Sequence, residues 1–296
     1  MADSTEGPLS AKINHYFQHR SEPERVFFEK IRQTLSLRTI LARRAMAKAI
    51  APASSFSIDD ERGFSVFAPR AFAEAAEIAD ATRALDGSVD LERPGLSKKA
   101  RSGFMVPLID PGTLDLSSPF LRLAIRPDVI AAVSTYLGMV PVLAHLNVYY
   151  SGEMPDQARQ SQLFHCDADA TRQVKIFVLC SEVTPTDGPL TLLDARTSVN
   201  LRKKLKYQFG KKIKDPVVLR GAPDVERHPI LGPPGTICFV DTTRCFHFGS
   251  RVEKGATPRL LTMIQYLTPA SFMLPRDHRK GAPFRHLSTD DLSRAQ

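Results

Sequence analysis

The second half of the chain constrains the fold more than any other feature of the sequence. From Pro141 onward, short apolar runs alternate with turn residues. Seven runs are expected to form strands, at residues 142–150, 162–166, 174–182, 190–194, 217–219, 236–241 and 260–267. Turn signals separate them, among them Asp187-Gly188-Pro189 and Gly232-Pro233-Pro234-Gly235. Many short strands with wide connections are typical of a jelly roll, in which two sheets pack together.

The first half of the chain is predicted to be largely helical. Residues 23–50 have no interior Gly or Pro and carry apolar residues at a helical period, and residues 69–85 and 128–137 also favour helices. Residues 63–67 are expected to form a short strand. Helices before a β core make the chain α+β. We divide it into a helical extension (1–57), a main domain (58–275, with the jelly roll mainly at 141–270) and a C-terminal tail (276–296).

Composition favours a soluble globular protein. Of the 296 residues, 43% are hydrophobic and 24% are charged, which excludes disorder as the main state. The N-terminus lacks the apolar core of a signal peptide, and the four cysteines form no Cys-x-x-Cys pair. The uncharged stretch 129–152 is interpreted as a helix end, a turn and a strand. A cytoplasmic protein with reduced thiols and no transmembrane segment is therefore expected.

Positive charge is concentrated in two segments. The chain carries a net charge of +8, which permits an anionic partner. Residues 21–50 contain seven basic and three acidic side chains, and residues 202–220 contain eight basic side chains and one acidic one. The first segment is expected to pack on the main domain or to lie on an anionic membrane. The second, which we call the basic insert, is either a solvated helix face or a rim that attracts an anionic substrate. Nucleic acid is not the expected partner, because the insert has few aromatic residues.

One set of side chains has the composition of a metal site. His165 and Asp167 are two residues apart on an expected strand, so both side chains face the same side. His247 follows later, near the end of another expected strand. Two imidazoles and one carboxylate form the facial triad of non-haem Fe(II) oxygenases, which leaves three coordination positions open. A buried hydrogen-bonded pair is the alternative interpretation. The rival ligands are His145, Asp169 and Asp241.

Four further side chains are candidates for binding a co-substrate or substrate. Arg259 opens an apolar strand and could hold a carboxylate through two hydrogen bonds, with Arg251 as the alternative. Lys175 would be costly to bury unless it met an anion, and the alternative is that it faces outward. Asn147 and Gln162 lie on expected strands that enter the site, where either could hydrogen-bond a ligand.

The combined order of motifs resembles the phytanoyl-CoA dioxygenase family over roughly residues 63–270. The motifs are Gly63-Phe64-Ser65-Val66, Ser161-Gln162-Leu163-Phe164-His165-Cys166-Asp167, Lys175-Ile176-Phe177-Val178-Leu179, Asp187-Gly188-Pro189-Leu190, Pro234-Gly235-Thr236-Ile237-Cys238-Phe239-Val240-Asp241, His247-Phe248-Gly249 and Pro258-Arg259. The resemblance implies a double-stranded β-helix (jelly-roll or cupin-like) core with N-terminal and flanking helices. It also implies that His165, Asp167 and His247 bind Fe(II), and that Arg259 pairs with 2-oxoglutarate.

The activity implied by this resemblance is that of an Fe(II)- and 2-oxoglutarate-dependent dioxygenase. Such an enzyme uses O2 to hydroxylate an unactivated C–H bond of a small molecule, an anionic one included, and releases succinate and CO2. The run 194–198 departs from the family pattern near the expected site mouth, so the resemblance does not identify the substrate. The alternatives are a non-catalytic or nucleic-acid-associated binding protein on the same fold, or an oxygenase that acts on a macromolecule.

Overall fold

The computed structural model describes residues 8–86, 89–92, 94, 96–154, 157–274, 284–287, 292–293 and 295–296. Most of the expected C-terminal tail at 276–296 therefore lies outside the described residues. Within the described part of the chain, no helix is both long and apolar enough to cross a membrane.

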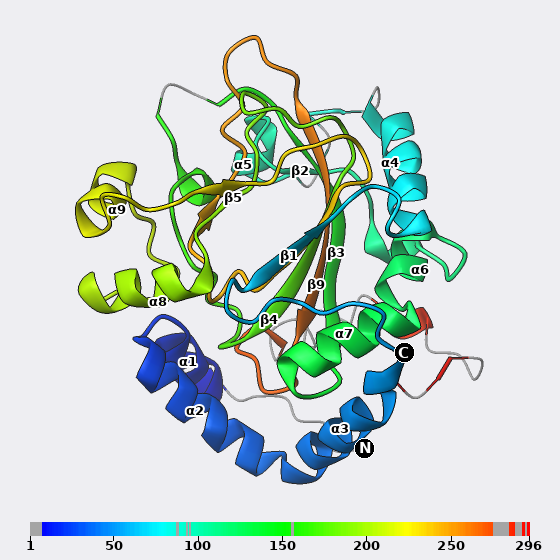
Figure 1. Ribbon diagram of the computed structural model, residues 1–296, viewed down its shortest axis with the longest axis vertical. Helices are drawn as coiled ribbons and strands as arrows, with labels where there is room; N and C mark the ends of the chain where they lie inside the picture. The colour runs from blue at the N-terminus through cyan, green and yellow to red at the C-terminus, as the bar shows by residue number, and fades with distance from the viewer. Residues whose placement is uncertain are drawn as a thin grey trace.

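Two antiparallel sheets form the core of the protein (Figure 1). The larger sheet contains, in spatial order, β1 (Phe64–Phe67), β7 (Ile237–Val240), β4 (Gln173–Leu179), β9 (Arg259–Leu267), β3 (Val142–Ser151) and β2 (Val106–Pro107). The smaller sheet contains β6 (His228–Pro229), β5 (Thr191–Leu192) and β8 (His247–Phe248). Side chains of both sheets, such as Phe177, Val240 and Leu192, share one buried cluster between them. The expected α+β class with a jelly-roll core and flanking helices is confirmed.

Helices cover the opposite face of the larger sheet. They are α4 (Ala73–Asp86), α6 (Pro119–Ala124) and α7 (Pro127–Leu137), which Figure 1 shows beside the sheet. Alternation along β4 places Val174, Ile176 and Val178 in the cluster that these helices share with the sheet. The other side chains of β4, Lys175 among them, consequently face the space between the two sheets.

Three helices precede the core: α1 (Pro8–Gln18), α2 (Glu22–Leu35) and α3 (Leu37–Ile50). The single helix expected over 23–50 is thus two helices, which Ser36 separates with a φ of −113° and a ψ of 29°. This break was missed because it contains neither Gly nor Pro. Figure 1 shows the three helices as an arc along the lower edge of the molecule. Other short helical segments are α5 (Lys98–Arg101), η1 (Ala51–Ala53), η2 (Pro111–Thr113), η3 (Gln160–Gln162) and η4 (Arg285–Leu287).

Two expectations between the core strands are wrong. Residues 217–219 belong to α9 (Asp215–Gly221), which begins with Asp-Pro and buries Val218. Residues 162–166 form no continuous strand, because Gln162 ends η3 and only Phe164 and His165 make isolated bridges. The run 194–198, which departs from the family pattern, opens α8 (Ala195–Lys204). Its N-cap Asp194 accepts a hydrogen bond of 2.7 Å from the Thr197 backbone N–H.

Gly63 is packed too closely to carry a side chain. Its φ is +76°, and a Cβ there would lie 2.7 Å from Cys245 Sγ and 2.9 Å from Ala195 Cβ. Gly138, the C-cap of α7, has a similar φ of +73° but nothing within 4 Å of the equivalent position. The two glycines thus share one backbone conformation and differ in packing.

We expect Gly63→Ala to lower the free energy of unfolding by about 1–3 kcal/mol more than Gly138→Ala, because only the first adds an overpacked methyl group. Both substitutions carry a left-handed backbone cost of about 1 kcal/mol. Urea denaturation of the two variants measures the difference. Equal losses would contradict the packing argument.

Candidate active site

The triad expected from the sequence is assembled in the fold. His165 and His247 exchange backbone hydrogen bonds of 3.0 and 2.9 Å, which set their imidazole centroids 4.2 Å apart. Asp167 Oδ1 lies 3.6 Å from His165 Nε2 and 3.8 Å from His247 Nε2. Ligand atoms of the three residues all lie within 4.8 Å of one another, close enough to hold one metal ion.

Hydrogen bonds to the backbone orient both imidazoles. His165 Nδ1 lies 2.8 Å from the Leu163 carbonyl oxygen, and His247 Nδ1 lies 3.1 Å from that of Cys245. A carbonyl can only accept, so each Nδ1 carries the proton and each Nε2 keeps its lone pair. Burial lowers the pKa of both imidazoles, that of His165 well below its usual range. Both rings are thus neutral ligands aimed at the Asp167 carboxylate.

The two oxygens of Asp167 have different partners. Oδ1 faces the histidines, whereas Oδ2 lies 2.7 Å from Lys175 Nζ. Burial by itself would raise the pKa of Asp167, but the charge and the hydrogen bond of Lys175 oppose it, and that pKa lies well below its usual range. For Lys175 likewise, the neighbouring carboxylates outweigh burial and raise the pKa. Asp167 is therefore ionised, with Oδ1 available as a metal ligand.

Lys175 faces inward, so the outward alternative is wrong, and the carboxylates it meets belong to the protein. Asp169 Oδ2 is 3.7 Å from the same ammonium and accepts a hydrogen bond of 2.8 Å from Gln265. Gln173 donates to Asp167 Oδ2 at 3.4 Å. Asp169 thus supports the ammonium and lies outside the group of three metal-ligand candidates.

Arg259 is a buried cation without a counter-charge. Its side chain is 3% exposed, and its terminal nitrogens donate to the Gly188 carbonyl at 2.6 Å and to Ser250 Oγ at 2.7 Å. Its Nε has no partner, and among the described residues no carboxylate forms an ion pair with it. Burial lowers the pKa of Arg259 to about 10. Since a buried charge is costly unless paired, the position suits an exogenous anion.

Arg251, the alternative anchor, already has a carboxylate. Its guanidinium makes two hydrogen bonds with Asp215, of 2.9 and 2.7 Å, and lies over the Phe248 ring at 3.5 Å. Its Nε donates to the Gln162 carbonyl. This geometry holds the basic insert against the smaller sheet and leaves Arg259 as the cation that lacks a counter-charge.

Asn147 and Gln162 lie in different surroundings. Asn147 is buried on β3, donates to the Ile109 carbonyl at 3.1 Å, and has no partner for its Oδ1. Gln162 is bonded to the backbone on both sides, because it donates to the Ser250 carbonyl at 2.8 Å and accepts from the Arg159 N–H. His145, a rival ligand, bonds Tyr149 Oη at 2.8 Å, and burial lowers its pKa to about 4. Asn147 is thus the one of these three with a free buried acceptor.

The rival carboxylate Asp241 supports a turn. Its Oδ1 accepts hydrogen bonds from the backbone N–H groups of Thr243 and Arg244, and Tyr136 Oη lies 3.3 Å from its Oδ2. Burial raises the pKa of Asp241 to about 6. This turn leads directly to the strand that carries His247.

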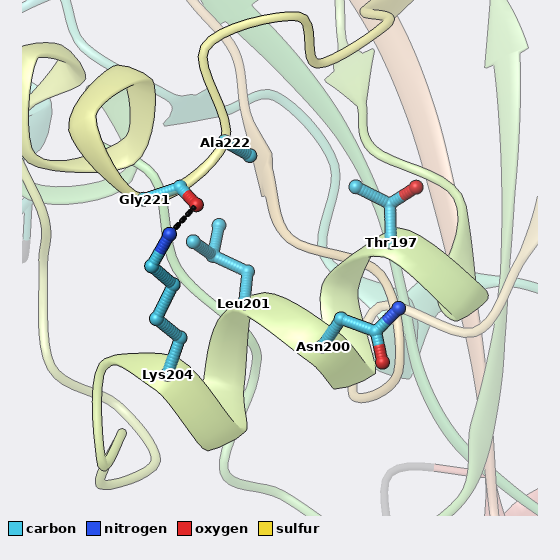
Figure 2. Close-up of a pocket in the computed structure, with 6 residues that line it drawn as sticks. All are labelled: Thr197, Asn200, Leu201, Lys204, Gly221 and Ala222. Carbon is cyan, nitrogen blue, oxygen red and sulfur yellow. Dashed lines mark hydrogen bonds between the residues drawn. The ribbon is translucent and has the colours of Figure 1, made fainter.

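The basic insert runs beside the triad. Phe164 and Ile213 exchange backbone hydrogen bonds of 3.0 and 2.8 Å, so the insert is paired with the residue that precedes His165. After burial, the charge of Lys212 is among the causes that lower the pKa of both triad histidines. A separate surface pocket of about 220 Å³ lies between α8 and α9, where Lys204 Nζ donates to the Gly221 carbonyl (Figure 2). No triad residue lines that pocket.

Several side chains of the site were not singled out from the sequence. Gln173 and Gln265 share the inward faces of β4 and β9 with Lys175 and Arg259, and strand alternation from those two residues could have found them. Ser250, which accepts from Arg259, carried no such signal. It lies in a loop with a positive φ of 59°.

Comparison with known proteins extends the fold assignment. No protein-family model matches the sequence, and no curated protein matches it. The structure resembles that of EctD from S. alaskensis with bound Fe, at 18% identity and a TM-score of 0.50 over 71% of this chain and 74% of that one. A second similar structure is that of the epimerase SnoN, at 19% identity and a TM-score of 0.48 over 76% of this chain and 84% of that one. A third is that of HygX from Streptomyces hygroscopicus with nickel and 2-oxoglutarate bound, at 16% identity and a TM-score of 0.48 over 71% of this chain and 84% of that one. At this identity the likeness to EctD shows the fold.

Proposed function

We propose that the protein is an Fe(II)- and 2-oxoglutarate-dependent dioxygenase that hydroxylates a small molecule. The observation that carries this proposal is the pairing of two neutral histidines and an ionised aspartate with a buried arginine that lacks a carboxylate. The triad is a ligand set suited to iron(II). The arginine suits the distal carboxylate of a keto acid. That EctD, which shares the fold, is described with bound Fe supports the same assignment.

Each side chain of the site has a definite task in this proposal. His165, His247 and Oδ1 of Asp167 would hold the iron, and Lys175 keeps the second oxygen of Asp167 engaged. Arg259 and Ser250 would receive the distal carboxylate of 2-oxoglutarate, and the free Oδ1 of Asn147 would accept a hydrogen bond from a donor group of the substrate. When bound, the iron supplies the activation of O2 that the protein's own side chains do not provide. The protein contributes orientation and a water-poor interior.

We expect Asp167→Ala to abolish Fe(II) binding and the formation of succinate from 2-oxoglutarate, because one of three ligands is lost. Anaerobic calorimetric titration with Fe(II) and a succinate assay measure the two effects. Asp169→Asn is the matched control, since Asp169 is a neighbouring half-buried carboxylate outside the ligand set, and it should retain Fe(II) binding. Unchanged Fe(II) affinity in Asp167→Ala would refute the assigned site.

We expect Arg259→Ala to weaken the apparent affinity for 2-oxoglutarate by about 30-fold or more, since losing a buried charge partner costs about 2–5 kcal/mol. Arg259→Lys should also raise the KM for 2-oxoglutarate, because an ammonium cannot reproduce a two-point contact. The measurement is the KM for 2-oxoglutarate in the succinate assay, with Fe(II) binding as a control. If Arg251→Ala lost this dependence and Arg259→Ala kept it, the anchor would be Arg251.

The substrate in this proposal is anionic, a carboxylate, phosphate or coenzyme A ester. The basic insert supports this choice: it pairs with Phe164 beside the triad, and Lys203, Lys211 and Lys214 are on its exposed surface. Positive potential at a site mouth raises the encounter rate with an anion and is screened by salt over about 8–10 Å.

We expect kcat/KM for the true substrate to fall as salt rises, and Lys211→Gln with Lys212→Gln to flatten this dependence. Arg70→Gln with Lys254→Gln removes the same charge from exposed positions outside the insert and serves as the control. Uncoupled turnover of 2-oxoglutarate should be equal in both double variants. A kcat/KM that did not depend on salt would exclude a steering role.

A further inference from the structure

The outer sides of the N-terminal helices carry most of the exposed apolar side chains. Ten large hydrophobic residues of the described chain are exposed, and seven lie on α1, α2 and α3: Ile13, Tyr16, Phe27, Ile31, Leu35, Leu37 and Leu41. On α2, Phe27, Ile31 and Leu35 follow one another at intervals of four residues, which places them on one side of the helix. Phe27 is 63% exposed and Leu35 is 82% exposed, so this side is uncovered by the described residues.

The acidic side chains of these helices have partners, whereas several of the cations form no ion pair. The acidic residues are engaged: Glu22 pairs with Arg202, Glu24 with Arg20, and the buried Glu29 accepts from Thr171. Five cations of the helices are exposed and form no ion pair with any described residue: Lys12, Lys30, Arg38, Arg44 and Lys48. The uncompensated charge on the exposed surface of these helices is therefore positive.

We propose that the outer surface of α1–α3 docks on an anionic lipid bilayer. Exposed apolar side chains interspersed with unpaired cations match the two components of such a surface, acyl chains and acidic headgroups. A second copy of the chain fits less well, since a two-fold interface would set the same five cations against one another. Because no described helix is long and apolar enough to span a bilayer, the attachment is peripheral.

The docking surface is joined firmly to the site. Arg25, on the inner side of α2, is 1% exposed and donates to the carbonyl oxygens of Ala168 and Ala170, just after Asp167. Arg202 of the basic insert bonds Glu22 at the start of the same helix. Because of these contacts, α2 has a fixed position relative to the triad, and so would a bilayer bound to α2. The proposal itself depends on no metal or co-substrate.

Co-sedimentation of the full chain with sucrose-loaded vesicles tests this inference. Phosphatidylcholine vesicles are compared with vesicles that contain about 30 mol% phosphatidylserine, and we expect at least about tenfold stronger binding to the second kind. Phe27→Ser with Leu35→Ser, and separately Lys30→Gln with Arg38→Gln, should each reduce that binding about tenfold or more. All four side chains are exposed, so the variants should keep the thermal stability of the parent chain.

Matched controls separate the surface from general effects. Val66→Ser with Leu231→Ser removes exposed apolar side chains elsewhere, and Arg70→Gln with Lys254→Gln removes exposed charge elsewhere. Both control variants should bind vesicles as the parent does.

Absence of binding to phosphatidylserine vesicles, or equal loss in the controls, would overturn the inference. So would a dimer in analytical ultracentrifugation that Phe27→Ser with Leu35→Ser dissociates, because the surface would then belong to a second copy. None of these readouts involves iron or 2-oxoglutarate.

Discussion

The pair of backbone hydrogen bonds between His165 and His247 is the interaction on which the site depends. It joins two segments that are far apart in sequence and places their imidazoles side by side. The same short pairing brings Asp167, two residues on, within reach of both Nε2 atoms. Three further contacts hold this arrangement: the insert at Phe164, the turn at Asp241, and Arg25 behind Ala168. Both imidazoles are thus oriented by backbone carbonyls, whereas the Asp167 carboxylate is held by the side chains of Lys175 and Gln173.

The space between the sheets contains two buried cations that are compensated differently. Lys175 lies against Asp167 and Asp169, so its charge is balanced within the protein and contributes to the ionisation of a triad carboxylate. Arg259 has only neutral acceptors, a carbonyl and a hydroxyl. A buried charge balanced by neutral groups alone leaves a strong preference for an added anion. This difference separates the proposed metal-binding half of the site from the proposed co-substrate half.

The two basic segments of the sequence are neighbours in the fold. Glu22 at the start of α2 bonds Arg202 of α8, which links the N-terminal helices to the basic insert (Figure 1). Positive charge from distant parts of the chain therefore gathers on adjoining elements beside the triad. In the two proposals, the positive charge of the basic insert attracts a small anionic substrate, and that of α1–α3 binds an anionic lipid surface.

The sequence alone determined the α+β class and the jelly-roll core, because the alternation of apolar runs and turn residues is a local property. It also singled out His165, Asp167 and His247 by their ligand chemistry, and the fold brings these three residues together. It also marked Arg259 at the start of a long strand. It did not predict the break at Ser36, where no Gly or Pro signals the change. It also placed a strand within the helix at 215–221, although Asp-Pro opens that helix.

Only the tertiary structure decided which charges are paired. It assigned Lys175 to Asp167, gave Arg251 to Asp215, and left Arg259 without a carboxylate. These partners come from different strands and helices, and their distances follow from how the two sheets and the insert pack. The free energy of a buried charge depends on those distances, which no local pattern in the sequence contains.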